Sequence, residues 1–562
     1  MRLPFEVQQV PLSHMSLVQV VPLGGVGEIG KSCAAVVQGD DMVLIDCGLS
    51  FPNEEMLGVD IVIPDFTWLI ENKHKLRGIF LTHAHEDHVG SLPYLLPHVE
   101  CPIYATEFTH ALIRHKLEEK CDINRLNLKV YKPGDIIQAG SLSVEPVRIT
   151  HSIPDTCCMA VRTEHGIILF TADFKFDFTP IDNKLSDITR LGELGKEGVV
   201  LLLSDSTNVE RPGWGPSERL VSEGLRRHFT QAAGRVLLTT FASNIHRIQQ
   251  VFDIAEETGR KVAVVGRRME QNIEVCSRLN YLRIPKGTHI KIEDARHHPN
   301  DKLAILTTGS QGEPMSALVR MSKEEYSRFR IQEGDTVLYS ARPIPGNEGA
   351  IWRTINRLFR QGATVVYESN PPIHVSGHAY REELKMMINL TQPYYAAPVH
   401  GEPRHQHLYK EMAREMGFPD SRLLTLEDGK PLCLDDKSWY FGDPVPAGSV
   451  LVDNSGTPGV SDEVLRDRKN LANDGVLVVT VAIDTDRGEM VGEPTVYSKG
   501  FHGPEGTLQS CVDVLADVLT ALTRDELKDT NRLKHDIADT VRKFVSKRTQ
   551  LRPLVLTALV EV

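Results

Sequence analysis

Apolar runs of four to seven residues recur along the first 210 residues, and most of them end at a polar residue or a glycine-rich turn. Runs of this length predict buried strands, and we expect strands at 16–22, 42–46 and 102–105. Longer stretches with helical spacing of their apolar residues, 65–75 and 106–119, predict helices. The alternation of the two kinds of element predicts an α/β fold.

The middle of the chain repeats this alternation with more regular spacing. Helices are expected between its strands, for example over 247–258 and 349–361. Strands that alternate with helices favour a mainly parallel sheet, and therefore a second α/β domain. The expected strands are 236–241, 262–265, 303–307, 336–339 and 364–367.

A proline- and glycine-containing linker, 442–461, separates this core from a small α+β domain over 462–562. Two strands open the small domain and a final strand closes it, with two helices between them. The expected strands are 475–484, 489–498 and 554–562, and the expected helices are 508–522 and 526–547.

A chain of 562 residues implies more than one domain. It has no apolar run of about 18 residues, so no membrane span is expected. Its first 14 residues lack the pattern of a secretory signal and read as an unstructured lead-in, with Met15 as an alternative start. The nine cysteines form no Cys-x-x-Cys pair, which favours reduced thiols and a cytoplasmic location.

The net charge of −12 is unevenly distributed. Residues 211–371 contain 24 lysines and arginines against 17 aspartates and glutamates, so this basic segment lies in an otherwise acidic chain. Such a segment is compatible with local binding of nucleic acid. Ordinary variation along a long chain explains the same numbers equally well.

The most informative stretch is 79–90, IFLTHAHEDHVG. A short apolar strand is followed within six residues by His83, His85, Asp87 and His88. Imidazole and carboxylate groups at this spacing are ligands for zinc or manganese. The earlier turn GGVGEIG, 24–30, has imperfect spacing for a dinucleotide loop and is followed by strands, so we reject a nucleotide site there.

The His-x-His-x-Asp-His motif resembles the signature of the metallo-β-lactamase superfamily. The resemblance implies an αββα sandwich that binds two metal ions and takes further ligands from later strand ends. His151 in VRITHS and Asp173 in LFTADF lie at such ends. The resemblance also implies that Asp46, at the end of another strand, supports the metal loop by hydrogen bonds.

Three further stretches resemble the β-CASP nucleases, which insert an α/β domain into that sandwich. They are SDSTNVERPG with Asp205, HVSGHA with His378, and PVHGEPRH with His400. Together with FASNIHR and TTGSQGEP they resemble the bacterial ribonuclease J family over nearly the first 410 residues. The sandwich is then formed by 16–211 and 371–441, and the β-CASP domain by 212–370. Small departures are Ala172, where glycine is more usual, and Lys31-Ser32.

The resemblance assigns a role to each of these residues. His83, His85 and His151 would bind one metal ion, Asp87, His88 and His400 the second, and Asp173 would bridge them. His378, oriented by Asp205, would protonate the leaving oxygen. Contacts to substrate phosphates are expected from 374–378 and from the start of the helix after 241, which suits an anion. The substrate-binding set is His374, Val375, Ser376, Gly377, His378, Ser243, Asn244, His246 and Arg247.

The implied activity is 5′-to-3′ exonuclease and endonuclease cleavage of single-stranded RNA with a 5′-monophosphate, in RNA decay and maturation. The resemblance further implies a homodimer or higher homo-oligomer, RNA-decay partner proteins, and a structural calcium ion near Asp60 and Asp453. Two alternatives are a small-molecule hydrolase of the superfamily and an inactive RNA-binding scaffold. Asp205, His378 and the insertion disfavour the hydrolase, and removal of metal by EDTA distinguishes the scaffold.

Overall fold

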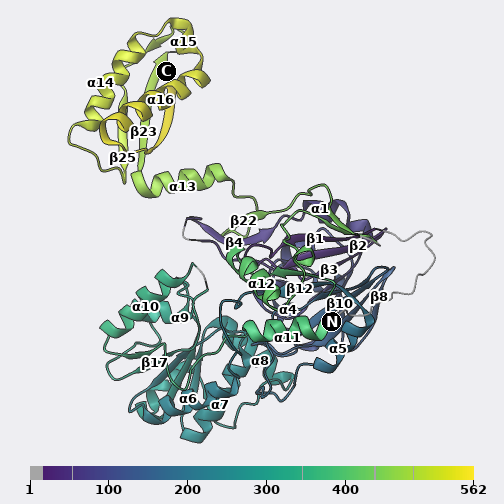
Figure 1. The fold of residues 1–562 in the computed structure, drawn as a ribbon. Coiled ribbons are helices and arrows are strands. Elements are labelled where there is room, and N and C mark those ends of the chain that lie inside the picture. Colours follow the sequence, from purple (N-terminus) through teal and green to yellow (C-terminus); the bar gives the residue numbers. More distant parts are fainter. Residues whose placement is uncertain (1–16, 54, 345, 436–437, 485) are drawn as a thin grey trace. The chain divides into compact units, whose positions relative to one another are not determined.

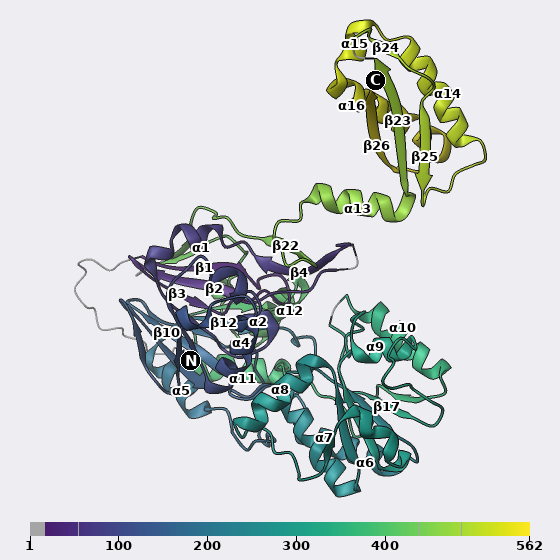
Figure 2. The same ribbon diagram turned by 180° about the vertical axis from the view of Figure 1, so that it is seen from behind.

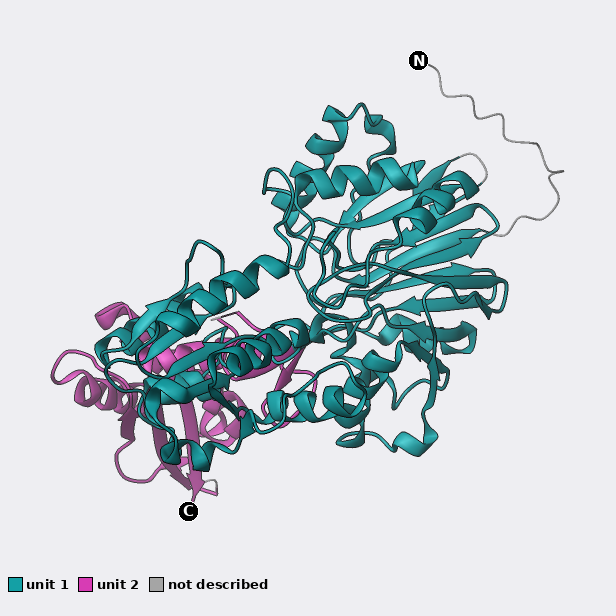
Figure 3. Ribbon diagram, turned by 90° about the horizontal axis from the view of Figure 1, so that it is seen from below, with its two compact units in different colours: residues 1–51, 62–449 teal, residues 52–61, 450–562 magenta. Residues whose placement is uncertain are grey.

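The computed structural model describes residues 17–53, 55–344, 346–435, 438–484 and 486–562. The expected lead-in and the alternative start at Met15 lie outside these residues. The chain divides into two units, one of residues up to 51 and 62–449, the other of 52–61 and 450–562 (Figure 3). In the described part, no helix is both long enough and apolar enough to span a membrane.

Two sheets packed face to face form the centre of the first unit (Figure 1). The first sheet has the order β21-β20-β1-β2-β3-β5-β6-β7, and its middle strands β3, β5 and β6 run parallel. Helix α4 (Glu107–Glu118) packs on its edge. The strands are β1 (Val18–Gly24), β2 (Cys33–Gln38), β3 (Asp41–Ile45), β5 (Leu76–Phe80), β6 (Pro102–Ala105), β7 (Asn127–Val130), β20 (Leu432–Leu434) and β21 (Trp439–Phe441).

The second sheet has the order β19-β12-β11-β10-β9-β8, with β11, β12 and β19 parallel. One face shares a buried apolar core with the first sheet, and the other is covered by α5 (Ile188–Glu197), α11 (Arg381–Thr391) and α12 (Pro403–Glu415). The strands are β8 (Ile137–Ala139), β9 (Leu142–Arg148), β10 (Cys157–Thr163), β11 (Gly166–Phe170), β12 (Val199–Asp205) and β19 (Tyr395–Val399). The expected αββα sandwich is therefore confirmed.

The inserted domain contains a parallel sheet of order β15-β14-β16-β13-β17-β18. Helices α6, α7 and α8 pack on one face, and α9 and α10 on the other (Figure 2). The strands are β13 (Val236–Thr239), β14 (Lys261–Val265), β15 (His289–Ile290), β16 (Leu303–Thr307), β17 (Thr336–Tyr339) and β18 (Thr364–Val366). The helices are α6 (Arg219–Gln231), α7 (Ile245–Thr258), α8 (Arg267–Arg278), α9 (Ala317–Ser322) and α10 (Glu348–Arg360).

The second unit has a four-stranded sheet, and the helices that share its buried core pack on one face of that sheet. Along β23 (Val476–Asp484), every second residue is buried against those helices, and the residues between them lie on the open face. The other strands are β24 (Glu489–Met490), β25 (Thr495–Lys499) and β26 (Leu554–Glu561), and the helices are α14 (Thr507–Thr520), α15 (Arg524–Lys528) and α16 (Thr530–Thr549).

Several expected elements differ from the structure. Strand β4 (Val59–Pro64) was not expected, and it pairs with β22 (Ser449–Asp453) inside the expected linker. Helix α13 (Asp462–Asp474) was not expected. The helix expected at 526–547 is two helices, because Asp529 ends α15 and its side chain caps the start of α16. The strand expected at 489–498 is likewise two short strands.

Candidate metal centre

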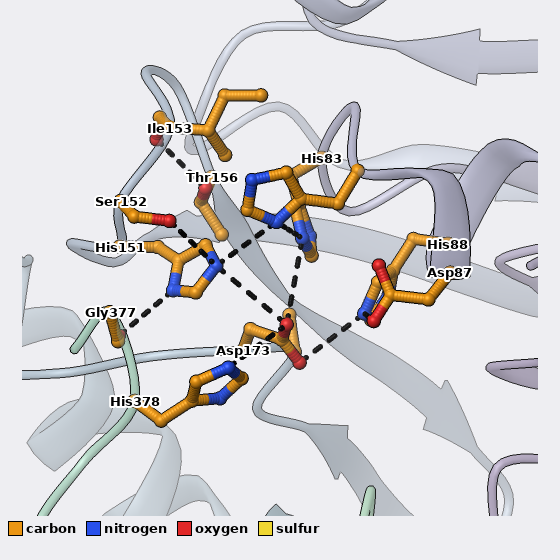
Figure 4. Close-up of polar contacts among 12 residues, drawn as sticks. His83, Asp87, His88, His151, Ser152, Ile153, Thr156, Asp173, Gly377 and His378 are labelled. Carbon is orange, nitrogen blue, oxygen red and sulfur yellow. Dashed lines mark hydrogen bonds and ion pairs between the residues drawn. The ribbon is translucent and has the colours of Figure 1, made fainter. Parts of the chain in front are cut away.

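The ends of parallel strands bring the expected metal ligands together. Asp46 follows β3, and His83 and His85 follow β5, with Asp87 and His88 on the short helix α2 (Glu86–Val89). On the other sheet, His151 follows β9, Asp173 follows β11, and His400 follows β19. Carboxyl ends of parallel strands meet at one edge of a sheet, and here the two edges face each other. Figure 4 shows His83, His151 and His88 gathered around Asp173.

Three imidazole nitrogens converge at one point of the site. His85 Nδ1 lies 3.0 Å from His83 Nε2 and 3.2 Å from His151 Nε2. Two nitrogens bound tetrahedrally at about 2.0–2.1 Å from one zinc ion lie roughly 3.3 Å apart, so these three positions fit a shared ion. Burial lowers the pKa of all three imidazoles, that of His85 to about 4. The three are neutral near pH 7, as metal ligands must be.

Four other side chains form a second, more acidic group. Asp87 Oδ2 lies 3.1 Å from His400 Nε2, and His88 Nε2 lies 3.3 Å from Asp173 Oδ1. The atoms His88 Nε2 and Asp173 Oδ1 are buried and have no hydrogen-bond partner. Unpaired buried polar atoms are costly, and a metal ion between them removes that cost. The donor set of two imidazoles and two carboxylates therefore fits a second divalent ion.

Asp173 joins the two groups through its two oxygens. Its Oδ2 lies 3.7 Å from both His83 Nε2 and His151 Nε2, whereas its Oδ1 faces His88 and His400 at 3.3 and 3.6 Å. The carboxylate is 2% exposed. Each oxygen of Asp173 therefore faces a different group of candidate ligands.

The pKa values in the second group are set by its own members together with Asp46. Burial alone would raise the pKa of Asp173, but the charges of His400 and His88 hold it well below the usual range. Burial alone would lower the pKa of His88, but Asp173, Asp46 and Asp87 hold it well above the usual range. The pKa of His400 is raised in the same way by Asp173 and Asp87. A metal ion that binds this group must displace these protons.

Neighbouring groups orient the ligands. His88 Nδ1 lies 2.7 Å from Asp46 Oδ2, and His151 Nδ1 lies 2.8 Å from the carbonyl oxygen of Gly377. Thr82 donates its hydroxyl hydrogen to Asp46 and lies 3.0 Å from His83 Nδ1. Each contact leaves the other ring nitrogen free to face the metal. Asp46 thus contacts two residues of the segment that follows β5, Thr82 and His88.

The backbone approaches the ligands closely at two glycines. A Cβ atom on Gly377 would lie 2.7 Å from the His151 ring, and one on Gly48 would lie 1.6 Å from the Asp87 carbonyl oxygen. Ala172, next to the bridging Asp173, has a φ of 54°. This left-handed conformation is the physical reason why glycine is more usual at that position.

His378 lies beside the metal ligands and has a different partner. Its Nδ1 is 2.8 Å from Asp205 Oδ2, and its Nε2 is 4.0 Å from Asp173 Oδ2. Burial opposes the charged form of the imidazole, but Asp205 and Asp173 raise its pKa to about 9. His378 is therefore protonated near pH 7, with Nε2–H directed toward the metal centre.

The residues just before His378, 374–377, differ in burial and in hydrogen-bond partners. The Val375 side chain is buried in the core of the inserted domain, so it does not face the site. The Gly377 carbonyl oxygen is used by His151. Ser376 is half-buried, and His374 has a buried Nδ1 with no partner. Burial and the nearby charges of Arg247, Arg342 and Lys175 keep the pKa of His374 well below its usual value.

The start of α7 differs from the expected phosphate site. The Arg247 guanidinium is fully buried and is bound by Glu218, with its Nη2 2.6 Å from the carboxylate. Asn244 uses its side-chain oxygen to cap the helix at Arg247 N. His246 Nε2 lies 3.6 Å from Asp182, whose carboxylate would repel a phosphate. The expectation for Arg247 and Asn244 is corrected, since both have structural partners; Ser243 is half-buried at the loop.

Comparison with known proteins agrees with this architecture. The metallo-beta-lactamase superfamily matches residues 26–207, and the Zn-dependent metallo-hydrolase RNA specificity domain matches 368–420. The ribonuclease J beta-CASP domain matches 233–358, and the ribonuclease J C-terminal domain matches 463–562. Ribonuclease J of Thermus thermophilus is 42% identical over 553 residues, which cover 97% of this chain and 95% of that protein.

The chain belongs to the ribonuclease J family. Ribonuclease J2 of Bacillus subtilis is 37% identical over 548 residues, with coverage of 97% of this chain and 99% of that protein. A crystallised Enterococcus faecalis protein of unknown function has a TM-score of 0.55 at 17% identity, and covers 75% of this chain and 100% of its own. That last likeness shows the fold alone.

Sequence reasoning did not single out three polar residues that contact the site residues. Thr82 bridges Asp46 and His83, Thr207 contacts His400, and Asn208 contacts Ser376. Their positions in the sequence could have indicated them. Each follows an apolar strand and lies within a few residues of an expected functional residue. A hydroxyl or amide in such a place needs a partner, but the sequence alone does not say which one.

Proposed function

We propose that the protein is a ribonuclease that hydrolyses phosphodiester bonds with two divalent metal ions. The observation that carries this proposal is Asp173, whose two oxygens face two separate sets of ligands. When two ions are bound there, they polarise the phosphate and activate a water molecule. Membership of the ribonuclease J family supports RNA as the substrate.

The chain's own residues supply the proton that the leaving group needs. Water attacks phosphorus, the bond from phosphorus to the 3′-oxygen breaks, and His378 Nε2–H transfers its proton to that oxygen. Asp205 accepts a hydrogen bond from His378 Nδ1 and holds the imidazole protonated and oriented. The attacking water loses a proton, which restores the proton on His378, so the net reaction consumes one water molecule and gives a 3′-hydroxyl and a 5′-phosphate.

The 5′-terminal phosphate is, in our proposal, recognised around His374 and Ser376. His374 carries a buried nitrogen without a partner, and the charges of Arg342 and Lys175 act on it. A terminal monophosphate carries more negative charge than an internal diester, so this environment favours it. The start of α7 contributes through Ser243, because Arg247 and Asn244 have structural partners.

A terminal phosphate held one nucleotide beyond the metal ions places the first phosphodiester bond at the reaction centre. The enzyme would then degrade RNA from 5′ to 3′, with endonuclease cuts when an internal strand enters the site. Roles in RNA decay and maturation follow from this preference. The test uses one RNA with a 5′-hydroxyl, a 5′-monophosphate or a 5′-triphosphate, labelled at its 3′ end. Equal rates on all three, or shortening from the 3′ end, would exclude recognition of the 5′-phosphate.

The identity of the metal, the cellular location, the partner proteins and the calcium ion are also proposals. The ligands suit zinc and manganese equally. All nine cysteines are free, which supports a cytoplasmic protein. RNA-decay partner proteins remain a prediction, as does structural calcium. In the described part of the chain, metal-ligand side chains gather only at the centre above, and Asp453 Oδ1 accepts hydrogen bonds from Ser455.

Self-association is proposed through the C-terminal domain. The helix face formed by Leu515 and Leu519 packs inside that domain, so it needs no second chain. The open face of the sheet instead exposes Leu556 by 49%, Val560 by 47% and Tyr497 by 66%. Strand pairing places Tyr497 and Leu556 on either side of Val478. This apolar face supports a homodimer or higher homo-oligomer.

A further inference from the structure

We propose that the turn at the end of β12, residues 205–208, is a positioning element in which Thr207 fixes the orientation of His400 and Asn208 fixes that of Ser376. Asp205 of the same turn already orients His378. The turn is held in shape by a hydrogen bond from Thr207 N to Asp205 Oδ1, 2.9 Å long. One short segment would then control a metal ligand, the proton donor and a substrate contact.

The hydroxyl of Thr207 has a single hydrogen, and its contacts determine where that hydrogen lies. Thr207 Oγ1 is 2.8 Å from the carbonyl oxygen of His400, which can only accept, so the hydroxyl donates to it. The same Oγ1 is 3.0 Å from His400 Nδ1 and must therefore accept from an Nδ1–H group. The proton on Nδ1 leaves Nε2 as the nitrogen that can bind a metal ion.

The other ring nitrogen, Nε2, faces the other members of the second group of ligands. His400 Nε2 lies 3.1 Å from Asp87 Oδ2 and 3.6 Å from Asp173 Oδ1. His400 itself has a φ of 50°, so its backbone is held in a strained conformation. Thr207 contacts both the ring and the carbonyl oxygen of this residue, and it thereby fixes ring and backbone together. We infer that the affinity for the second ion depends on the Thr207 hydroxyl.

The hydrogen bonds of Asn208 likewise determine where the hydroxyl hydrogen of Ser376 lies. The Asn208 amide group donates to Ser376 Oγ at 2.8 Å and to the carbonyl oxygen of His378 at 3.2 Å. Ser376 Oγ also accepts from His378 N at 3.2 Å. With both lone pairs engaged, the Ser376 hydroxyl is left to donate its hydrogen elsewhere. It is a ready donor to a phosphate oxygen, which deepens the proposed function and rests on it.

The first experiment measures metal binding and does not require catalysis. Full-length wild type, Thr207→Val and Thr207→Ser are stripped with EDTA and titrated with Zn²⁺ by calorimetry. Valine keeps the branched shape without the hydroxyl, and serine keeps the hydroxyl. We expect Thr207→Val to weaken the second binding event by about 10- to 100-fold, and Thr207→Ser to stay close to wild type.

Unchanged binding by a folded Thr207→Val variant would overturn the role of Thr207, as would a loss in Thr207→Ser equal to that in Thr207→Val. If Thr207→Val does not fold, Thr207→Cys replaces it, because a thiol is a weak donor and acceptor. These outcomes remain informative even if the protein fails to cleave RNA, since the readout is bound metal.

The second experiment tests Asn208 with an isosteric change. In Asn208→Asp the carboxylate cannot donate, so the Ser376 hydroxyl turns to donate to it. We expect KM for 5′-monophosphorylated RNA to rise roughly 10- to 100-fold, the effect of losing a hydrogen bond to a charged group, with two ions still bound. Ser376→Ala should give a similar rise and the double variant no further one. Additive effects in the double variant, or an unchanged KM in Asn208→Asp, would overturn the proposal for Asn208.

Discussion

The Nδ1 atom of His378 lies 2.8 Å from Oδ2 of Asp205, and the Asp205 carboxylate is 1% exposed. The contact uses Nδ1 of the imidazole, and the other ring nitrogen, Nε2, lies 4.0 Å from Asp173 Oδ2 and faces the metal centre. His378→Ala is therefore expected to slow RNA cleavage by about 10²–10⁴-fold, the usual effect of losing a general acid. Metal analysis should still find two ions per chain, and loss of one ion would make His378 a ligand instead.

The same pair sets the pH dependence of cleavage. Asp205 and Asp173 overcome the effect of burial and raise the pKa of His378 to about 9, so the donor is protonated below that pH. The rate should fall as the pH rises through about 9. Asp205→Asn removes the first of these charges, so the fall in rate should occur at lower pH. A fall in rate at the same pH in wild type and variant would show that Asp205 does not support the proton on His378.

Loss of one ligand from either metal group should abolish cleavage. His83→Ala removes a buried nitrogen of the first group, and Asp87→Ala removes a carboxylate of the second. Both variants should keep the far-ultraviolet circular dichroism spectrum of the wild type and bind fewer metal ions. His407 is an exposed histidine on α12, so His407→Ala is the matched control with unchanged rate. Near wild-type turnover in His83→Ala or Asp87→Ala would contradict the ligand assignment.

Ala172 offers a test of backbone strain next to the bridging carboxylate. An alanine with a φ of 54° costs roughly 1–2 kcal/mol, whereas glycine in a folded chain costs about 0.5–1 kcal/mol of extra entropy. The first effect is larger, so Ala172→Gly should stabilise the protein by about 0.5–1 kcal/mol. Chemical denaturation measures this difference. A lower midpoint for Ala172→Gly would show that the left-handed conformation at this position is not strained.

The open sheet face of the C-terminal domain predicts which substitutions dissociate the oligomer. Leu556→Lys with Val560→Lys places two charges on that face, and light scattering should then report the mass of a single chain. Val518, on the outer side of α14, is 38% exposed and lies on another surface. Val518→Lys is the control and should leave the mass unchanged. An unchanged mass in the double variant would exclude this face as the interface.

The sequence was sufficient for the fold class and for the positions of the expected ligands, because both depend on local patterns. A buried strand followed within three residues by His83 or Asp173 is recognisable in the sequence and is present in the structure. Helix α13 was missed because none of its residues is buried and it lacks a clear apolar stripe. Strand β4 was missed because its partner strand β22 is almost 400 residues away in the chain.

The substrate-binding residues were the least predictable part of the site. Arg247 was expected to bind phosphate, but its guanidinium is buried and donates hydrogen bonds to Glu218 and to the carbonyl oxygen of Ile373. Both partners are distant in the sequence, so no local pattern reveals the pairing. Val375 lies between two polar residues and still points into the hydrophobic core, because alternate residues of an extended chain face opposite sides.

The central claim is that RNA hydrolysis requires both ions that Asp173 separates. The most direct measurement titrates EDTA-stripped protein with Mn²⁺ or Zn²⁺ while following bound metal and cleavage of 5′-monophosphorylated RNA in the same samples. The account predicts little cleavage at one equivalent of metal and full activity only as the second equivalent binds. Full activity with a single bound ion, or with none, would contradict it.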